Sequence, residues 1–383
     1  MKRIYLDHAA TTPVAKEALQ IMQPFFSERY GNASSLYSFG REAKEAIEDA
    51  RLKAAKVINA EPREIVFTSG GSESDNMVLR GIPKAGDHVI TSAFEHHAVL
   101  HTCQALEKQD VRVTYLPITK DGFVRPEDVR KAITKNTKLV SIMHANNEIG
   151  TIQPIAEIGK ICKDAGVLFH TDAVQTYGKI PIDVKKVSVD FLSASGHKLY
   201  GPKGVGILFM RNGASLRPLI TGGSQEHKLR AGTENTAGIV GFGKAAELAL
   251  NNMDKEAAYL TKLRDMLIDG VLKIEDSWLN GSRQNRLPNN TNFGFDYIEG
   301  ESIILHLDLN GVAASTGSAC SSESLTPSHV LTAIGLSPMK AHGSLRMTLG
   351  KENTKEDINY VLGVLPEIVE NLRKISPMML ARK

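Results

Sequence analysis

One lysine stands in a glycine-rich turn between two predicted strands. Lys198 lies within the stretch SASGHKLYGPKGVG, which follows an apolar run at 189–192, and a β-rich run follows at 205–210. A turn between strands can hold a lysine still and partly remove it from water, and such a lysine can form a Schiff base with an aldehyde. The alternative, for a lysine taken alone, is an ordinary solvated turn residue. The choice depends on the other polar groups of the chain.

A run of small residues after an earlier predicted strand could bind a phosphate group. Residues 68–74 read TSGGSES, and they follow an apolar run and open a helix. Small side chains let backbone N–H groups and a hydroxyl approach a phosphate, and the helix dipole favours an anion there. The run lacks the lysine of a nucleoside-triphosphate loop, so the phosphate would belong to a different ligand. A plain helix N-cap is the alternative.

A carboxylate and an amide at another strand end suit an electron-poor aromatic ring. Asp172 lies in the stretch HTDAVQ. A carboxylate near a buried site can hold a pyridinium nitrogen protonated, which keeps a pyridoxal ring electron-poor. Gln175, three residues later, could reach the phenolic oxygen of such a ring. A helix N-cap is the alternative for Asp172.

Two adjacent histidines, His96 and His97, lie just beyond a predicted strand and turn. A histidine at this place could stack on a cofactor ring or move protons. Because neighbouring side chains point in different directions on any regular element, we expect one histidine to serve and the other to be exposed. Adjacent histidines make no metal site without further ligands, and the sequence shows no metal-binding spacing, so we expect no metal.

One of the three cysteines lies in a setting that differs from those of the other two. Cys320 is surrounded by small polar residues in STGSACSSES, which predicts a mobile, exposed loop and a candidate nucleophile. Cys103 and Cys162 lie among apolar residues at helical spacing, and we expect them to be buried and inert.

Arg346 is the candidate for holding a substrate. It lies in the alternating stretch SLRMT, and its guanidinium group could bind a carboxylate through two hydrogen bonds. A surface salt bridge is the alternative.

Apolar runs alternate with helical stretches over most of the chain, which predicts a mainly parallel seven-stranded sheet covered by helices on both faces, an α/β fold. The predicted strands are 64–68, 87–91, 111–116, 138–143, 166–170, 189–193 and 205–210. Ligands bind beyond the carboxyl ends of such strands, and the polar residues described above fall there. Helical spacing predicts helices at 39–58, 96–108 and 154–165, and Thr11-Thr12-Pro13 is expected to open a helix with the proline in its first turn.

The pattern changes after a long, mostly helical connection at 236–273. Short strands near 291–296 and 312–316, a glycine-rich loop at 317–322 and a helix at 354–374 predict a smaller α+β domain. We therefore predict a large domain at 15–260 and a small domain formed by 1–14 and 261–383.

Composition limits the class of protein and its compartment. With 383 residues the chain has room for two domains, and its formal charge of +3 implies no nucleic acid or anionic membrane partner. No apolar run approaches the length that spans a bilayer. The first residues, MKRIYLDHAATTP, include an acid and a histidine where a signal peptide would be apolar, and three cysteines form no disulfide framework. We expect a cytoplasmic enzyme.

The motifs together resemble those of the cysteine desulfurases of the NifS/IscS type, within the class V aminotransferase superfamily of fold-type I pyridoxal-phosphate enzymes. In chain order they are YLDHAATTP, GNASS, FTSGGSESDN, EHHAVL, HANNEIGT, HTDAVQ, SGHKLYGPKG, RAGTEN, STGSAC and SLRMTLG. The chain departs from the family pattern at Ala33, Tyr37 and Ser72, and no departure removes a catalytic group.

The resemblance implies a role for each group, with Lys198 forming the Schiff base with pyridoxal 5'-phosphate. The implied phosphate ligands are Gly71, Ser72, Ser195, His197 and, from the other subunit of a homodimer, Thr233. The implied ring contacts are Asp172 at the nitrogen, Gln175 and Asn147 on the phenolic side, and a catalytic His96 stacked on the ring. The implied ligands of the substrate carboxylate are Asn32 and Arg346.

The resemblance also implies a reaction. Cysteine displaces Lys198, the freed lysine moves the α-proton, and the thiolate of Cys320 attacks the substrate sulfur. Alanine leaves, and the persulfide on Cys320 passes to an acceptor protein for iron–sulfur cluster assembly or tRNA thiolation; Cys320 could also ligate a cluster transiently with a scaffold. The alternatives are a class V aminotransferase or a selenocysteine lyase on the same fold, and a sulfur carrier or scaffold protein with a vestigial pocket.

Overall fold

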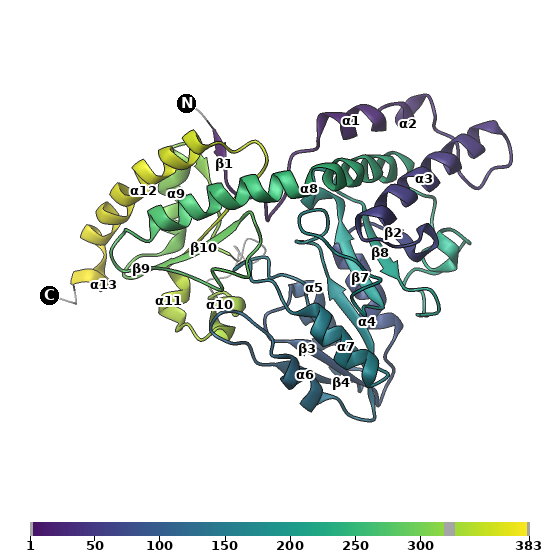
Figure 1. Ribbon diagram of the computed structural model, residues 1–383, viewed down its shortest axis with the longest axis horizontal. Coiled ribbons are helices and arrows are strands. Elements are labelled where there is room, and N and C mark those ends of the chain that lie inside the picture. Colours follow the sequence, from purple (N-terminus) through teal and green to yellow (C-terminus); the bar gives the residue numbers. More distant parts are fainter. Residues whose placement is uncertain (1–2, 318–325, 381–383) are drawn as a thin grey trace.

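A seven-stranded sheet forms the larger part of the molecule (Figure 1). The computed structural model describes residues 3–317 and 326–380. In spatial order the strands are β2 (Ile65–Thr68), β8 (Gly206–Met210), β7 (Phe191–Ser195), β6 (Leu168–Asp172), β5 (Thr137–Ser141), β3 (His88–Ser92) and β4 (Arg112–Leu116). Only β8 runs against its two neighbours, and the other pairs are parallel. The predicted α/β class with a mainly parallel sheet is confirmed, and each predicted strand lies within a few residues of an observed one.

Successive residues of these strands enter two different cores, because side chains alternate between the faces of a sheet. Ile65 and Phe67 join one core, whereas Val66 between them joins the other. Helices α3, α7 and α8 cover the first face, and α4 and α5 cover the second. Both faces are therefore apolar, and polar groups gather where the strands end.

The helices of this part include those predicted at 39–58, 96–108 and 154–165, each matched within a few residues by α3, α5 and α7. They are α1 (Lys16–Met22), α2 (Pro24–Ser27), α3 (Ser38–Val57), α4 (Gly71–Gly81), α5 (His97–Glu107), α6 (Pro126–Ala132), α7 (Ile155–Asp164) and α8 (Thr236–Val271), with short 3-10 helices η1 (Pro62–Glu64), η2 (Gly196–Lys198) and η3 (Glu226–Lys228). The prediction that Pro13 lies in the first turn of a helix is wrong. The N–H groups of Thr12 and Ala15 instead donate to the carbonyls of His197 and Tyr200, and α1 begins only at Lys16.

A second, smaller group of strands and helices lies at the other end of the molecule (Figure 1). Its three-stranded antiparallel sheet has the order β12 (Ser344–Thr348), β10 (Asn290–Phe295) and β9 (Ser277–Leu279), and β1 (Ile4–Tyr5) pairs with β11 (Val312–Ala313). Its helices are α9 (Gly300–Leu309), α10 (His329–Ala333), α11 (Pro338–His342), α12 (Lys355–Ile375) and α13 (Pro377–Leu380). Thr354 and Asp357 form a capping box at the start of α12.

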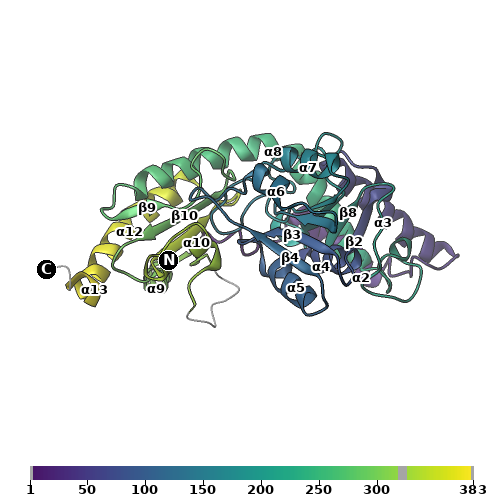
Figure 2. The ribbon, with the colours of Figure 1, turned by 90° about the horizontal axis from the view of Figure 1, so that it is seen from below.

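Helix α8 connects the two groups, and both views show it running along each of them (Figures 1 and 2). Its first half supplies Phe242 to the large core, and its second half supplies Leu267 to the core of the small sheet. The proposed domain boundary at residue 260 thus falls inside a helix. Val330 and Leu331 of α10 pack into the large core although they follow that boundary. The division into two domains stays a prediction. In the described ranges, no helix has the length and apolar character that crossing a membrane requires.

A buried ion pair holds the segment that precedes α8. Both Nη atoms of Arg51 donate to the carboxylate of Glu226, at 2.7 and 2.8 Å, and the N–H of Phe67 donates to the same carboxylate at 2.7 Å. Arg51 is 3% and Glu226 7% exposed. Glu226 and the two residues after it have φ values of 42°, 59° and 68°, a left-handed conformation that is costly outside glycine. The ion pair therefore secures a strained turn.

We predict that Glu226→Gln lowers the free energy of unfolding by about 3 kcal/mol, because the buried Arg51 guanidinium then keeps only the half-exposed Glu48 as an ionic partner. Thermal or urea unfolding measures the change. As a control, Glu127→Gln removes the partner of Arg130 from an exposed ion pair and should cost less than about 1 kcal/mol. Equal stability of the two variants would contradict the assigned role of the buried pair.

Candidate active site

A cavity of about 400 Å³ opens where the carboxyl ends of the large-sheet strands face the small sheet. Most of the predicted site residues line it: Gly71, Ser72, His96, Asn147, Asp172, Gln175, Ser195, His197, Lys198 and Arg346. The strands β2, β3, β5, β6 and β7 lead into all of them except Arg346, which comes from β12. The cavity thus brings together Gly71 and Arg346, which are 275 positions apart in the sequence.

The start of α4 forms one wall of the cavity and suits an anion. Its N-cap is Gly70, so no side chain caps the helix, and its first N–H groups stay available to a ligand. A Cβ added to Gly71 would lie 2.5 Å from Cγ2 of Val174, which leaves room for glycine only. This geometry favours the phosphate interpretation over the plain N-cap.

Asp172 ends β6 and faces the cavity. Its Oδ1 accepts the N–H of Val174 at 2.8 Å, and the residue is 6% exposed. No helix begins there, so the N-cap alternative for Asp172 is wrong. Burial raises the pKa of this carboxyl to about 6, while the Val174 N–H and the nearby charge of Lys198 act in the opposite direction.

Lys198 is half-buried on η2, immediately after β7. Its Nζ donates to the carbonyl oxygen of Ala9 and, at 2.7 Å, to that of Ala10. These carbonyls belong to the N-terminal segment, so the ammonium group is fixed from across the cavity. The solvated-turn alternative is therefore wrong.

The residues around Gln175 form a polar cluster behind Lys198. Nε2 of Gln175 donates to the carbonyl of Ala9 at 3.1 Å, and its Oε1 accepts from Nζ of Lys179 at 3.4 Å. Burial lowers the pKa of Lys179 to about 7, and the neighbouring charge of Lys198 adds to this effect. The amide of Gln175 is thus oriented by contacts on both of its polar atoms.

Both adjacent histidines lie at the cavity. His96 is the N-cap of α5, and its Nδ1 accepts the N–H of Ala98 at 3.1 Å. The prediction that the second histidine is exposed is wrong, because His97 is half-buried and its ring lies 4.7 Å from that of His101 and 4.7 Å from that of His329. His329 also lines the cavity.

Arg346 is 2% exposed, so the alternative of a surface salt bridge is wrong. One Nη donates to Asp7 at 2.8 Å, and the other donates to the carbonyls of Asn147 and Gly317, each at 3.2 Å. Its Nε is buried without a hydrogen-bond partner in the described part of the chain. A buried guanidinium with an unused N–H is suited to a further anionic ligand.

Two predicted residues, Asn32 and Thr233, do not line the cavity, and a third, Cys320, cannot be compared with it. Asn32 belongs to the segment between α2 and α3, and its Oδ1 accepts the N–H of Ser34 at 2.9 Å. That segment lies at the outer end of the molecule in both views (Figures 1 and 2). Thr233 is exposed in the segment before α8. Cys320 lies in 318–325, outside the described residues, although Gly317, just before that range, lines the cavity.

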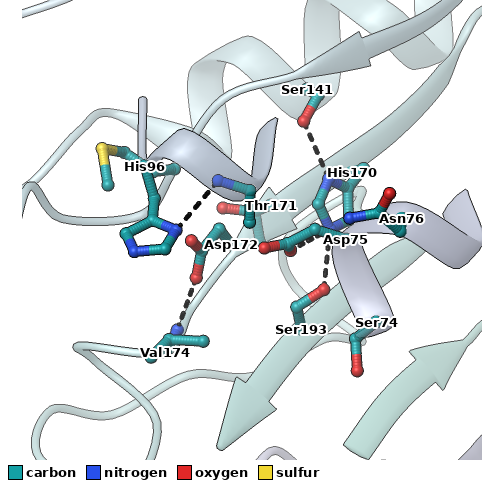
Figure 3. A network of polar contacts seen from close by, with 12 residues as sticks. Ser74, Asp75, Asn76, His96, Ser141, His170, Thr171, Asp172, Val174 and Ser193 are labelled. Carbon is teal, nitrogen blue, oxygen red and sulfur yellow. Dashed lines mark hydrogen bonds and ion pairs between the residues drawn. The ribbon is translucent and has the colours of Figure 1, made fainter. Parts of the chain in front are cut away.

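Sequence reasoning missed a buried polar network beside Asp172 (Figure 3). Asp75, from α4, lines the cavity and is 1% exposed, and its Oδ1 lies 3.6 Å from Nε2 of His170. His170 has a hydroxyl at each ring nitrogen, Ser141 at 2.8 Å and Ser193 at 3.0 Å. The only sequence signal for Asp75 is its spacing, four residues after Gly71, which places both on one face of α4.

Comparison with known proteins identifies the family to which the chain belongs. The Aminotransferase class-V family matches residues 4–361. The chain is 60% identical to "Cysteine desulfurase IscS" of Dictyoglomus turgidum, over 98% of this chain and 97% of that protein. The chain belongs to the cysteine desulfurases of the aminotransferase class-V family. The predicted resemblance is therefore confirmed.

Solved structures agree with this membership. A protein described as "NIFS-LIKE PROTEIN" superposes with a TM-score of 0.91 at 39% identity, covering 97% of this chain and all of that one. A structure described as "SspA in complex with cysteine" has a TM-score of 0.80 at 40% identity, covering 91% of this chain and 99% of that one. At these identities the likeness extends beyond the fold.

We predict that His96 stays uncharged, with its proton on Nε2, down to about pH 5. Burial lowers the pKa of His96 to about 4, the charge of Lys198 lowers it further, and the Ala98 N–H occupies Nδ1. Nitrogen NMR of histidine-labelled protein, assigned with His96→Asn, measures both the tautomer and the titration. A His96 signal that titrates near pH 6.5 would contradict this placement.

Proposed function

We propose that this enzyme is a cysteine desulfurase that uses pyridoxal 5'-phosphate to convert L-cysteine into L-alanine and retains the sulfur as a persulfide on Cys320. The observation that carries the proposal is the meeting of Lys198, Asp172 and the glycine-lined start of α4 in one cavity that also contains Arg346. This reaction needs an amine, a carboxylate beside the ring nitrogen, a phosphate-binding site and a group that binds the substrate carboxylate. The named relatives support the choice of substrate.

The cavity residues fit the cofactor. The uncapped N–H groups of α4, with Ser72, Ser195 and His197, would hold its phosphate, and Asp172 would bind the ring nitrogen. Gln175 and Asn147 would serve its phenolic oxygen, and His96 would lie against the ring. When bound, the cofactor supplies an aldehyde that condenses with amines and a ring that withdraws electrons.

Arg346 and Lys198 act on the amino acid. Arg346 binds the substrate carboxylate and so fixes the orientation of the Cα–H bond. Lys198 would take the α-proton of the bound amino acid and later return a proton to carbon. The carbonyls of Ala9 and Ala10 hold its Nζ in reach for both transfers.

Cys320 takes the sulfur. Its thiolate attacks the substrate Sγ, an S–S bond forms, and the Cβ–Sγ bond breaks with its electron pair moving to carbon. A proton then completes the methyl group of alanine, and the enzyme keeps Cys320 as a persulfide. The sum is cysteine plus the enzyme thiol giving alanine plus the enzyme persulfide, so no external oxidant or reductant enters.

A homodimer and an acceptor protein complete the proposal. Thr233 is exposed on a segment held by Glu226 and by the ion pair of Arg230 with Glu73 at 2.9 Å, and in the proposed dimer it would reach the phosphate site of the second copy. Asn32 would reach the substrate site in the same way. The acceptor would be an iron–sulfur scaffold or a tRNA-thiolation enzyme. The free thiols of Cys103 and Cys162 suit the cytoplasm.

An aminotransferase or a selenocysteine lyase on the same fold is the remaining alternative. A requirement for Cys320 would distinguish the proposed desulfurase from an aminotransferase, because transfer of an amino group needs no thiol. Comparing the rates of alanine formation from cysteine and from selenocysteine distinguishes the proposed desulfurase from a selenocysteine lyase.

We predict that Lys198→Ala removes the visible absorbance of the bound cofactor and lowers alanine formation by about 10²–10⁴-fold or more, because it removes both the covalent anchor and the proton carrier. The matched control is Lys203→Ala, an exposed lysine of the same turn, which should keep both properties. Unchanged absorbance in Lys198→Ala would contradict the assignment.

We predict that Cys320→Ala abolishes sulfide release and leaves the cofactor absorbance intact. Sulfide and alanine are measured after incubation with cysteine and a reductant, with and without candidate acceptors. Cys103→Ala and Cys162→Ala serve as controls, since both thiols are buried and burial raises the pKa of each to about 12. Loss of absorbance in Cys320→Ala would indicate a structural role, and sulfide release at the normal rate would exclude the thiol as the acceptor.

A further inference from the structure

Two carboxyl groups, not one, lie at the floor of the cavity where the ring nitrogen would bind. His170 and Asp172 are two residues apart on β6, so they share one face of the sheet. Helix α4 packs over that face and places Asp75 3.6 Å from His170 (Figure 3). Asp75 and Asp172 both line the cavity, at 1% and 6% exposure.

His170 provides no charge to balance either acid. It is fully buried, and burial lowers its pKa to about 3, so its ring is neutral. Its Nδ1 and Nε2 face the hydroxyls of Ser141 and Ser193. A neutral imidazole offers one N–H and one lone pair, and hydroxyls can match either tautomer.

The surroundings of the two acids differ. Asp172 accepts a backbone N–H at 2.8 Å and lies near the cation of Lys198. Oδ1 of Asp75 has no hydrogen-bond partner in the described part of the chain, and the groups that face Asp75 are Asp172, Glu95, His170 and the Ser193 hydroxyl. Burial and then the charge of Asp172 raise the pKa of Asp75 well above its usual range.

Glu95 adds no negative charge to this floor. It is fully buried between the Ser92 hydroxyl and the N–H of Met143. Burial raises the pKa of Glu95 to about 8, so this acid is mostly protonated at neutral pH.

We propose that Asp75 is a positioning residue that holds a proton beside His170 and Ser193, so that Asp172 alone carries the negative charge opposite the ring nitrogen. Two like charges in one buried space cannot both be stable. Because the cation of Lys198 stabilises the charge on Asp172, the proton goes to Asp75. If Asp75 were ionised, its charge would draw the proton onto Asp172, and Asp172 would no longer hold a pyridinium. The functional role given to this proton rests on the proposed cofactor chemistry. Where the proton lies is a property of this chain alone.

Carbon NMR of protein labelled at the aspartate side-chain carboxyls tests the proposal, with and without added pyridoxal 5'-phosphate. At pH 7 we expect one resonance of a protonated aspartic acid that is absent from Asp75→Asn and kept in Asp172→Asn. Infrared spectra should show the matching carbonyl stretch lost in Asp75→Asn. Because asparagine is neutral and of the same shape, Asp75→Asn should bind the cofactor as tightly as the unsubstituted protein within about threefold, whereas Asp172→Asn should bind it more weakly.

Three results would overturn the inference: no protonated aspartate at pH 7, a protonated signal that persists in Asp75→Asn, or one lost only in Asp172→Asn. If Asp75→Asn does not fold, Asp75→Ser provides the assignment, and titration of the resonance in the unsubstituted protein shows whether a proton is held above pH 7. A chain that takes up no cofactor would end the proposed function, and the resonance measured without cofactor would still decide where the proton lies.

Discussion

The contact between the Lys198 ammonium group and the carbonyls of Ala9 and Ala10 joins the two halves of the site. The segment that supplies these carbonyls begins in β1, beside β11, and the N–H of Ala9 donates to the hydroxyl of Thr348 in β12 at 2.8 Å. Asp7 of the same segment binds Arg346. One extended stretch of backbone therefore aligns the amine that comes from the large sheet with the guanidinium that comes from the small one, and neither sheet has a complete site alone.

Burial of titratable groups sets the electrostatics of the cavity. His96 and His170 are neutral because burial disfavours their charged forms, and Asp75 and Glu95 carry raised pKa values for the same reason. The ionic groups that remain have partners: Arg346 has Asp7, and Asp172 has the Val174 N–H. A site with few unbalanced charges can hold a zwitterionic amino acid and still distinguish its carboxylate from its amine.

The sequence predicts the strands well because each is a short apolar run, and helices of clear periodicity separate most of them. It does not predict the reversed direction of β8, since that strand is buried on both faces and looks like its parallel neighbours. Helix α10, with five residues, is too short for a periodic pattern. Asp75 was missed because a carboxylate in a polar helical stretch normally faces solvent, and its burial results from contact with β6 and β7. The distance of Asn32 from the cavity is likewise a property of tertiary structure that a local motif does not contain.

Helix α8 has 36 residues and a length of roughly 54 Å. Its backbone hydrogen bonds continue without a break from one core to the other, so the helix is rigid along its length. A change in the angle between the cores would therefore bend the helix. The stretch 254–259, between the two buried faces, is where such bending meets least side-chain packing. The rigidity of this helix therefore resists any change in the width of the cleft, in addition to the N-terminal segment that contacts both sheets.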